Sequence, residues 1–552
     1  MEADSDVQLG FEYTDGMSNV AMTKVQAEPG EALQLNITPN CDYTLETIDT
    51  GSQLRWIGNG RTVLNNKGNP VKQYEPYFSV NPFYEDNKEL VERGVTPILY
   101  YDALGRGVRT EFPDGTFTKV VFDSWHQKYY DQNDTILDSN WYQNRINNLI
   151  DAQLLAEGKD PNKEKAAAEK AAWHYDTPNI LHVDSLGRPV LSVAYNRRYE
   201  RDNMGTITGS SDELYSTQIL LDIEGNTRAV IDARGNTVMQ YAYNLLGHRV
   251  YESSMDAGEE WVLNNVAGNP IRNWDSKEQI FSTVYDLLQR PVEMRLQATG
   301  ATTTQLIEKV AYGESQPNAK ANNLRGQVYQ QYDASGRTTH EAFDFKGNLL
   351  TVKRQLAAAY QAAVIDWTDG SPTNRLESEV FTQDTEYEAL NRKQRLFNWY
   401  TSAQRVTVYL PTYNARGVLV SEEHLTDADK ANMESTGRRI TAVNNITYNE
   451  KGQRMRMRYG NGTNTYYHYD TETFRLIQLK TTLSGVNGTL PSMPSNLSDP
   501  NVLQNLYYTY DAVGNISEIE DDAFEPVFFR NQQVAPKSGY IYDALYRLVE
   551  AT

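Results

Sequence analysis

Residues Leu221-Asp222-Ile223-Glu224-Gly225-Asn226-Thr227-Arg228-Ala229-Val230-Ile231-Asp232-Ala233-Arg234-Gly235-Asn236 hold two copies of one turn in succession. Each copy has an apolar residue, Asp, two variable residues, Gly and Asn. An Asp that opens a type I turn accepts hydrogen bonds from the backbone amides that follow it. The Gly supplies the positive φ with which the chain re-enters a strand through a bulge. The pattern therefore predicts a β-hairpin at each copy.

The same turn recurs along most of the chain. Further full copies are Tyr101-Asp102-Ala103-Leu104-Gly105-Arg106, Val183-Asp184-Ser185-Leu186-Gly187-Arg188, Tyr332-Asp333-Ala334-Ser335-Gly336-Arg337, Phe343-Asp344-Phe345-Lys346-Gly347-Asn348 and Tyr510-Asp511-Ala512-Val513-Gly514-Asn515. Looser copies begin at Tyr243, Tyr285, Tyr387, Tyr413, Tyr448, Tyr469 and at Tyr542-Asp543. An internal repeat indicates a fold assembled from one small unit. We therefore predict a mostly β protein with a long antiparallel meander of hairpins.

The composition favours a sheet that is wetted on both faces. Of the 552 residues, 39% are apolar, and Tyr outnumbers Phe by 37 to 15. Tyr has an apolar ring and a polar tip, and aromatic pairs across strands add about 0.5–1.5 kcal/mol each. An ordinary β-sandwich with Tyr-rich edges is the alternative.

Three regions depart from the repeat. Residues 1–95 lack the turn but contain short β-like runs, so we expect a β-rich N-terminal segment that leads into a repeat region over 96–552. Helical insertions are expected near 144–173 and near 353–367. In the first, Asp160 can cap a helix that starts at Pro161. The second is rich in alanine, a strong helix former.

The net charge of −21 argues against nucleic-acid binding, because such a protein needs a basic surface. With Cys41 as the single cysteine, there is no disulfide framework and no multi-cysteine zinc site. The acidic start of the chain is unlike a Sec signal peptide, and no apolar run reaches the length of a membrane span.

No group of residues predicts catalysis or a bound metal or cofactor. Asp123, His126, Asp131 and Asp134 form the densest set of potential acid, base or metal-binding groups, yet the spacing matches no known motif, and nearby aromatic residues favour a structural role. The run Glu520-Asp521-Asp522 lacks the alternating ligands of a calcium loop. Gly460-Asn461-Gly462 lacks the Lys-Ser/Thr of a phosphate-binding loop. We therefore expect no enzyme, and we predict that the functional residues are the structural ones of the repeat turns.

The repeat turns resemble the YD repeats of RHS proteins. A longer set of motifs resembles the RHS-bearing B and C components of bacterial insecticidal Tc toxins. These motifs include Arg55-Trp56-Ile57-Gly58-Asn59-Gly60-Arg61-Thr62-Val63, Gln73-Tyr74-Glu75-Pro76-Tyr77-Phe78, Phe112-Pro113-Asp114-Gly115-Thr116-Phe117 and Tyr542-Asp543-Ala544-Leu545-Tyr546-Arg547-Leu548. The resemblance covers residues 50–552.

The resemblance implies a ribbon of strands that spirals into a hollow shell around a toxic C-terminal domain. It also implies other toxin-complex components as partners, and a secreted or cell-surface location. Nothing after Leu548 resembles the family's self-cleaving region, so the expectation is a shell segment without protease or toxin. The alternative function is a secreted or cell-surface adhesion module that binds carbohydrate or protein.

Overall fold

The computed structural model of this protein describes residues 7–16, 18–37, 43–201, 207–368, 375–485, 488, 490–491, 499–530 and 532–552. Cys41 lies outside these ranges.

The N-terminal part contains a six-stranded sheet with the strand order β1-β2-β5-β8-β3-β4. Its strands are β1 (Gly10–Thr14), β2 (Val20–Ala27), β3 (Glu31–Ile37), β4 (Tyr43–Asp49), β5 (Arg55–Gly58) and β8 (Tyr77–Ser79); a separate hairpin pairs β6 (Thr62–Leu64) with β7 (Pro70–Gln73), and α1 spans Lys88–Val91. A small core of Met22, Tyr77, Leu90 and Val91 lies against this sheet. The boundary predicted at residue 95 stays a prediction, since the change of sheet occurs between Ser79 and Ile98.

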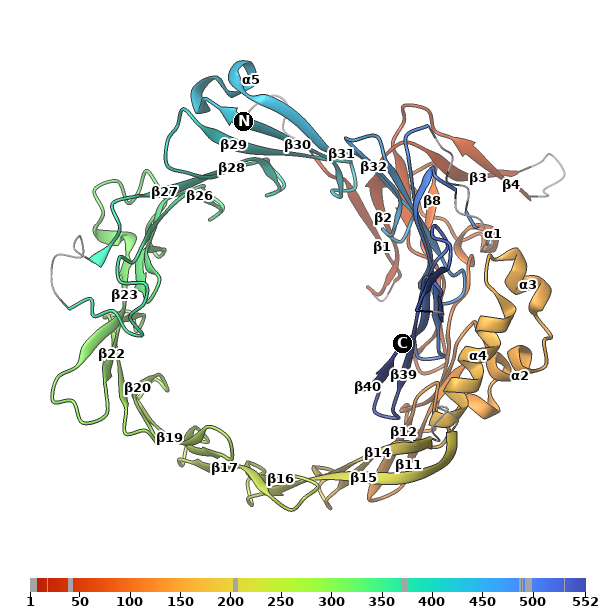
Figure 1. The fold of residues 1–552 in the computed structure, drawn as a ribbon, viewed down its shortest axis with the longest axis horizontal. Coiled ribbons are helices and arrows are strands. Elements are labelled where there is room, and N and C mark those ends of the chain that lie inside the picture. Colours follow the sequence, from red (N-terminus) through yellow and green to blue (C-terminus); the bar gives the residue numbers. More distant parts are fainter. Residues whose placement is uncertain are drawn as a thin grey trace. The chain divides into compact units, whose positions relative to one another are not determined.

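One antiparallel sheet of 30 strands accounts for most of the remaining chain. Its strands are β9 (Ile98–Tyr101), β10 (Gly107–Glu111), β11 (Phe117–Phe122), β12 (His126–Tyr130), β13 (Asn179–Val183), β14 (Pro189–Arg201), β15 (Ile207–Leu221), β16 (Thr227–Ile231), β17 (Thr237–Tyr243), β18 (Arg249–Ser254), β19 (Gly258–Asn264), β20 (Pro270–Asp275), β21 (Ile280–Tyr285), β22 (Pro291–Gln297), β23 (Gln305–Tyr312), β24 (Val328–Asp333), β25 (Gly336–Phe343), β26 (Leu349–Leu356), β27 (Phe381–Tyr387), β28 (Lys393–Tyr400), β29 (Val406–Tyr413), β30 (Leu419–Ala428), β31 (Arg438–Tyr448), β32 (Arg454–Tyr459), β33 (Asn464–Tyr469), β34 (Leu476–Thr482), β35 (Val502–Tyr510), β36 (Ile516–Asp521), β39 (Lys537–Tyr542) and β40 (Leu548–Ala551). Strands that are consecutive in the chain lie side by side (Figure 1). The predicted fold class, mostly β with a long antiparallel meander, is confirmed.

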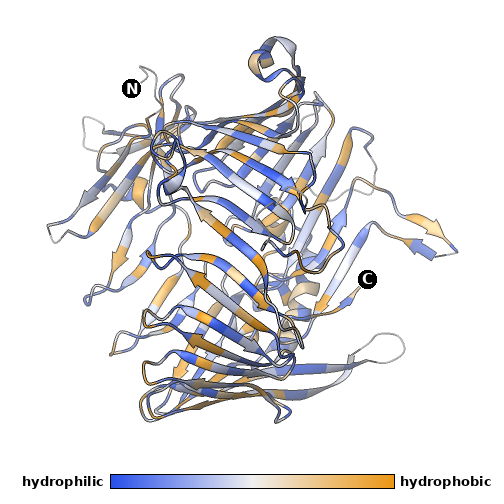
Figure 2. Ribbon diagram, turned by 90° about the vertical axis from the view of Figure 1, so that its left-hand side faces the viewer, coloured by the Kyte–Doolittle hydropathy of each residue, from blue (hydrophilic) through white to orange (hydrophobic). Residues whose placement is uncertain are grey.

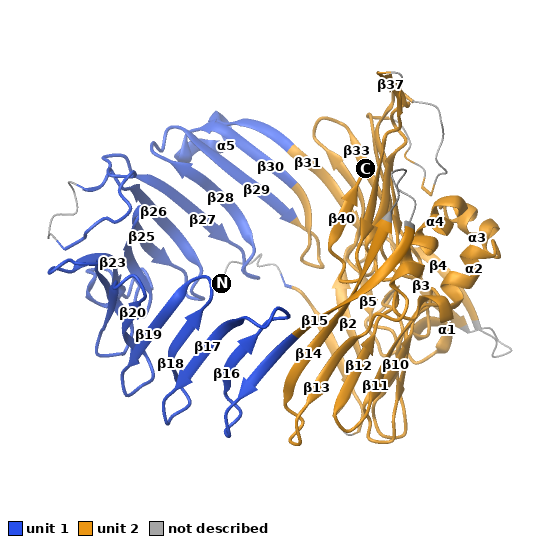
Figure 3. Ribbon diagram, turned by 60° about the horizontal axis from the view of Figure 1, so that its bottom comes forward, with its two compact units in different colours: residues 1–7, 217–412, 422–441 blue, residues 8–216, 413–421, 442–552 orange. Residues whose placement is uncertain are grey.

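The chain divides into two compact units (Figure 3). Unit 1 comprises residues 1–7, 217–412 and 422–441, and unit 2 comprises residues 8–216, 413–421 and 442–552. Unit 2 also contains a hairpin of β37 (Val527–Phe529) and β38 (Gln532–Val534) between β36 and β39.

The first predicted helical insertion is present in unit 2, between β12 and β13. It consists of η1 (Ile136–Asp138), α2 (Asn140–Ile146), α3 (Asp151–Ala156), α4 (Pro161–Ala171) and η2 (Ala172–His174). The Asp160 side chain accepts a hydrogen bond from the Asn162 amide, and Pro161 is the first helical residue, as expected for a capped helix. Other short helices are η3 (Gly313–Ser315), η5 (Lys430–Asn432) and α5 (Met433–Thr436).

The prediction of a helix near residues 353–367 was wrong. Residues 353–356 belong to β26, which pairs with β25 and β27, and residues 357–367 contain no helix. Ala357 instead packs in a small core with Ile365 and Trp367. Helix propensity is a weak preference, and here the strand pairing and this aromatic core outweigh it.

Most strand residues are half-buried rather than divided into a buried and an exposed face, as in β17 and β21. Figure 2 shows hydrophilic and hydrophobic residues interleaved along the strands. The dry cores are local: one contains Val406, Val408 and Leu425, and another joins Trp141, Ala168 and Ala171 of the insertion to Ala512. Within the described ranges, no helix is both long and apolar enough to span a membrane.

Candidate functional site

The repeat turns share one hydrogen-bond arrangement, shown by Asp102. Its Oδ1 accepts the amides of Leu104 and Arg106, both at 2.9 Å. Its backbone pairs with that of Arg106, and Gly105 has a φ of +83°. The Arg106 backbone amide and guanidinium hold the pKa of the Asp102 carboxyl below its ordinary value. The turn is therefore fixed by an ionised side chain as well as by backbone bonds.

The other predicted turn residues lie in the same arrangement, except that Asp511 accepts the amides three and four residues later and Asp333 lies in a tighter hairpin. In the turns opened by Asp184, Asp222, Asp232 and Asp344, the carboxylate accepts the amides two and four residues later, and Gly187, Gly225, Gly235 and Gly347 have positive φ. Asp511 and Asp543 also accept the amide four residues later. Asp333 differs, because it faces Gly336 directly across a tighter hairpin.

The sixth residue of the motif has a role that the sequence reasoning did not assign. The Arg188 guanidinium donates to the Asp184 Oδ2 at 2.7 Å, and the Asn226 amide donates to the Asp222 Oδ2 at 3.0 Å. The signal was present in the sequence, since this position is Arg or Asn in every full copy. Arg and Asn both serve at this position because each can donate a hydrogen bond to the second carboxylate oxygen. Arg337, in the tighter hairpin of Asp333, instead donates to Gln355.

The turns that join an odd-numbered strand to the next even-numbered strand all lie on one edge of an antiparallel sheet. We call this the repeat-turn edge. Neighbouring turns on it are bonded to each other: Asn348 donates to Asn391, Arg416 donates to the backbone carbonyl of Asn449, and Gln453 donates to that of Phe474. The edge is thus a continuous bonded rim along these parts of the sheet.

In unit 2, part of the repeat-turn edge meets an earlier part of the sheet in a buried polar cluster. Asn133 donates to the Asp511 Oδ2 at 2.9 Å, and the Tyr546 hydroxyl donates to Asp131. The Asp134 Oδ1 accepts the Thr177 hydroxyl at 2.8 Å. The cluster connects the loops on either side of the helical insertion to the turns at 511–514 and 543–546.

Burial shifts the pKa values of several groups in and beside this cluster. Burial and the adjacent Asp131 carboxylate raise the pKa of Asp134 to about 7. Burial also raises the pKa of the Tyr546 hydroxyl and lowers that of the His174 imidazole. Both Asp134 carboxylate oxygens accept hydrogen bonds from the protein, one from the Asp131 amide and one from the Thr177 hydroxyl. The carboxyl group therefore holds the fold together and is not presented to a substrate.

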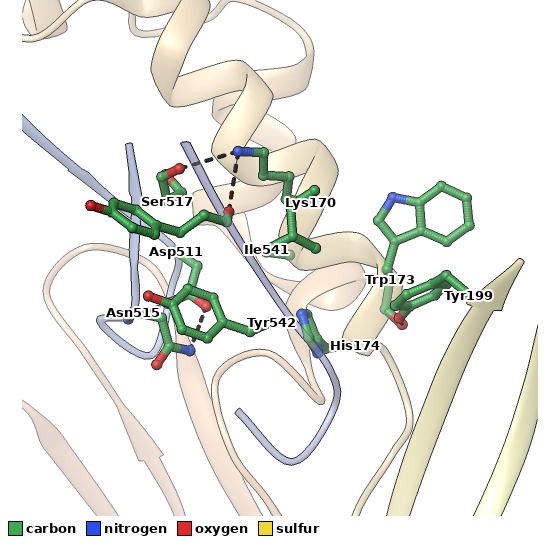
Figure 4. Close-up of a pocket in the computed structure, with 11 residues that line it drawn as sticks. Lys170, Trp173, His174, Tyr199, Asp511, Asn515, Ser517, Ile541 and Tyr542 are labelled. Atoms are coloured by element: carbon green, nitrogen blue, oxygen red, sulfur yellow. Dashed lines mark hydrogen bonds between the residues drawn. The ribbon is translucent and has the colours of Figure 1, made fainter. Parts of the chain in front are cut away.

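A small cavity lies beside the cluster (Figure 4). Its volume is about 50 Å³, and Trp173, His174, Tyr199 and Tyr542 contribute to its lining. The Lys170 amine donates to the backbone carbonyls of Ser517 and Tyr540. Sites for organic ligands usually measure about 300–1,000 Å³, so this cavity is too small for one.

The other candidate acid, base and metal-binding residues lie apart from one another or are engaged in contacts within the protein. His126 and Asp123 form an exposed contact of 2.9 Å at one end of β12, about 16 Å along the strand from Asp131 at 3.3 Å per residue. Glu520 pairs with Lys163. Gly462 occupies an ordinary hairpin turn with a φ of +90°. In the ranges that the structure describes, no group of three or more His, Cys, Asp or Glu side chains could hold a metal ion.

The repeated turn and the antiparallel meander place this chain in the class of RHS/YD-repeat proteins of the kind found in Tc toxins. Toxin subunit YenC2 of Yersinia entomophaga is 30% identical over 400 residues, which are 68% of this chain and 38% of that protein. Toxin subunit YenC1 of the same organism is 27% identical over 399 residues, 69% of this chain and 38% of that protein. The chain is homologous to these Tc toxin subunits over the shared stretch. No family model matches the sequence.

Solved structures share the fold. The crystal structure of TcdB2–TccC3 matches all of this chain with a TM-score of 0.78 at 23% identity, over 24% of that chain. The Photorhabdus luminescens Tc holotoxin pore matches with a TM-score of 0.78 at 24% identity, over 100% of this chain and 23% of that one. The chain therefore spans well under half the length of the proteins that it matches.

Proposed function

We propose that this chain is a wall segment of the shell of a bacterial insecticidal toxin complex, and that the shell encloses a toxic cargo polypeptide. The observation that carries the proposal is the sheet of 30 strands in which each hairpin along the repeat-turn edge leads directly to the next. Such a sheet has little dry core of its own, which suits a wall with water on both sides. The homology to toxin subunits supports the same role.

We further propose that the chain has no enzymatic activity and needs no cofactor. The carboxyl group with the most perturbed acidity, Asp134, is fully engaged by backbone and side-chain donors. The cavity beside it is too small for an organic substrate. The repeat-turn residues act as structural elements: the Asp and its sixth-position partner close each hairpin, and the Gly permits the required φ.

The proposed partners are a toxic cargo polypeptide and other components of the toxin complex. The chain acts outside the producing bacterium, either secreted or at the cell surface. Nucleic acid is not a partner, because the net charge of −21 would repel phosphate.

Protease protection tests the proposal. A protease-sensitive reporter is placed as the cargo of the complete toxin assembly that contains this chain, and its digestion is compared with that of the same reporter fused to the outside of the assembly. We expect the enclosed reporter to survive at least tenfold longer. Equal digestion of the two reporters would reject enclosure.

Adhesion is the second candidate, and the β37–β38 hairpin favours it. Val527, Phe528 and Phe529 on this hairpin are between 61% and 78% exposed. Exposed aromatic clusters often mark protein-binding surfaces. If the reporter is not protected, adhesion is tested by measuring binding of the chain to host-cell protein. Binding that is lost in the Phe528→Ser variant would make adhesion the preferred function.

A further inference from the structure

A pocket of ligand-binding size lies in unit 2, between β14 and β15 on one side and the β39–β40 turn and β40 on the other. Its volume is about 460 Å³, within the range of about 300–1,000 Å³ that sites for small organic ligands usually have. Arg547, the sixth residue of the last repeat turn, connects the two sides, because its guanidinium lies 5.7 Å from the centre of the Tyr215 ring. In size, this pocket is suited to an organic ligand, unlike the cavity beside the polar cluster.

Asn196 is a buried polar side chain in the lining of this pocket. It is 3% exposed, and its Nδ2 donates to the Glu213 Oε2 at 3.3 Å. Its Oδ1 is buried as well and has no hydrogen-bond donor among the described residues. Buried polar atoms in folded proteins nearly always have a partner, so this oxygen calls for a donor from outside the described chain. A hydroxyl group of a bound molecule is such a donor.

Glu213 places a hydrogen-bond acceptor among donors. The Tyr215 hydroxyl and the Asn196 amide donate to its carboxylate and hold the pKa of this group below its ordinary value. The positive charges of Arg198 and Arg547 act in the same direction, so the carboxylate is ionised at neutral pH. Among the described residues, both hydrogen bonds to this carboxylate use Oε2. The Oε1 atom can therefore accept a further donor, with two guanidinium groups near it.

The chemistry of the lining favours an uncharged ligand with several hydroxyl groups. The lining carries three guanidinium groups and three carboxyl groups, those of Arg197, Arg198, Arg547, Glu213, Asp543 and Glu550. A phosphate or an ammonium ligand would instead need an excess of one sign of charge. A carboxylate beside a guanidinium suits two neighbouring hydroxyl groups, because one hydroxyl donates to the carboxylate and the other accepts from the guanidinium. The Tyr199 ring and the exposed Val549 side chain add apolar surface for C–H groups.

We propose that this pocket binds a short, uncharged oligosaccharide. Glu213 accepts a hydrogen bond from one sugar hydroxyl, and Arg198 donates to a neighbouring one. Arg547 is both a structural residue, which pairs with Asp543 to close the last repeat turn, and part of the wall of the site. Sugar binding goes beyond the proposed enclosure of a cargo and does not depend on it.

Saturation-transfer NMR on the purified toxin assembly that contains this chain tests the proposal. The probes are lactose, cellobiose, maltotriose and N,N′-diacetylchitobiose, with glucose 6-phosphate as a charged comparison. We expect at least one of the uncharged saccharides to bind, and to bind more tightly than glucose 6-phosphate. The same saccharides immobilised on a surface separate two sources of this chemistry. Capture of the assembly on the surface indicates the end of a glycan chain, binding only in solution indicates a free sugar, and either result supports the site.

Two variants locate the binding. Arg198→Ala and Glu213→Gln should each weaken binding of the saccharide roughly tenfold or more, as expected for the loss of a charge-assisted hydrogen bond. Arg458→Ala, which removes an exposed arginine on β32 outside the pocket lining, is the matched control and should bind like the parent. Because Arg198 is exposed, the melting temperature of Arg198→Ala should equal that of the parent.

Three results would overturn the proposal. The first is that none of the four saccharides binds, so that the pocket holds only water or another part of the polypeptide. The second is tighter binding of glucose 6-phosphate than of any uncharged saccharide. The third is equal affinity in Arg198→Ala, Glu213→Gln and the control. Protection of the cargo reporter is measured separately and should be unchanged in both variants, so a failure of sugar binding is distinct from a failure of enclosure.

Discussion

Replacing Gly235 by valine tests the physical basis of the repeat turn. Gly235 has a φ of +82°, and a Cβ built there meets no atom within 4 Å. The substitution therefore creates no clash, and its cost is the strain of an L-residue at positive φ, about 1–2 kcal/mol. Opening of this one turn should become 5–30 times more frequent for that change in free energy, as an order-of-magnitude estimate.

Amide hydrogen exchange measures this effect locally. The Asn236 amide donates to the Asp232 Oδ1 at 2.8 Å, and the Asp232 amide donates to the Asn236 carbonyl at 2.9 Å. Both should exchange roughly 5–30 times faster in Gly235→Val. Gly235→Asn is the matched control, because Asn tolerates this conformation, and it should show a smaller change. Equal exchange in the valine variant and the parent would refute the requirement for positive φ.

Three further predictions concern unit 2. The pKa of Asp134 is about 7 in the folded chain against an ordinary 3.8, so the folded state binds more protons between these values, and this group's contribution to stability should fall as pH rises from 4 to 7. Denaturation of Asp134→Asn at several pH values should show less of this fall, and an identical pH profile would contradict the assignment. Tyr546→Phe removes the donor to the half-buried Asp131 carboxylate and should destabilise the polar cluster by about 1–3 kcal/mol in urea unfolding, whereas the exposed Tyr129→Phe should not. Ala512→Leu overpacks the core beneath the helical insertion and should cost about 1–3 kcal/mol by the same assay; a neutral effect would mean that the insertion does not pack on that turn.

The repeat turns could be predicted from the sequence because every contact that defines them is local. Asp102 accepts hydrogen bonds from the amides two and four positions later, so the six-residue pattern includes all the residues that fix the turn. The helix at Pro161 was predictable for the same reason, since its cap lies next to it. The failure at 353–367 has the opposite cause: alanine favours a helix locally, but residues 353–356 pair with β25 and β27, and Ala357 packs with Ile365 and Trp367, which are contacts between distant positions.

The buried cluster could not be found in the sequence. Asn133 and Asp511 are 378 positions apart, and Asp131 and Tyr546 are 415 apart. The sequence grouped Asp123 and His126 with Asp131 and Asp134, but β12 separates the two pairs.

Solution X-ray scattering of the purified toxin assembly that contains this chain tests the central claim, that the chain is part of a hollow wall, most directly. A hollow particle has few short interatomic distances. The maximum of its distance distribution should therefore lie at larger distances than that of a solid sphere of the same mass. A maximum at the solid-sphere position would contradict the shell.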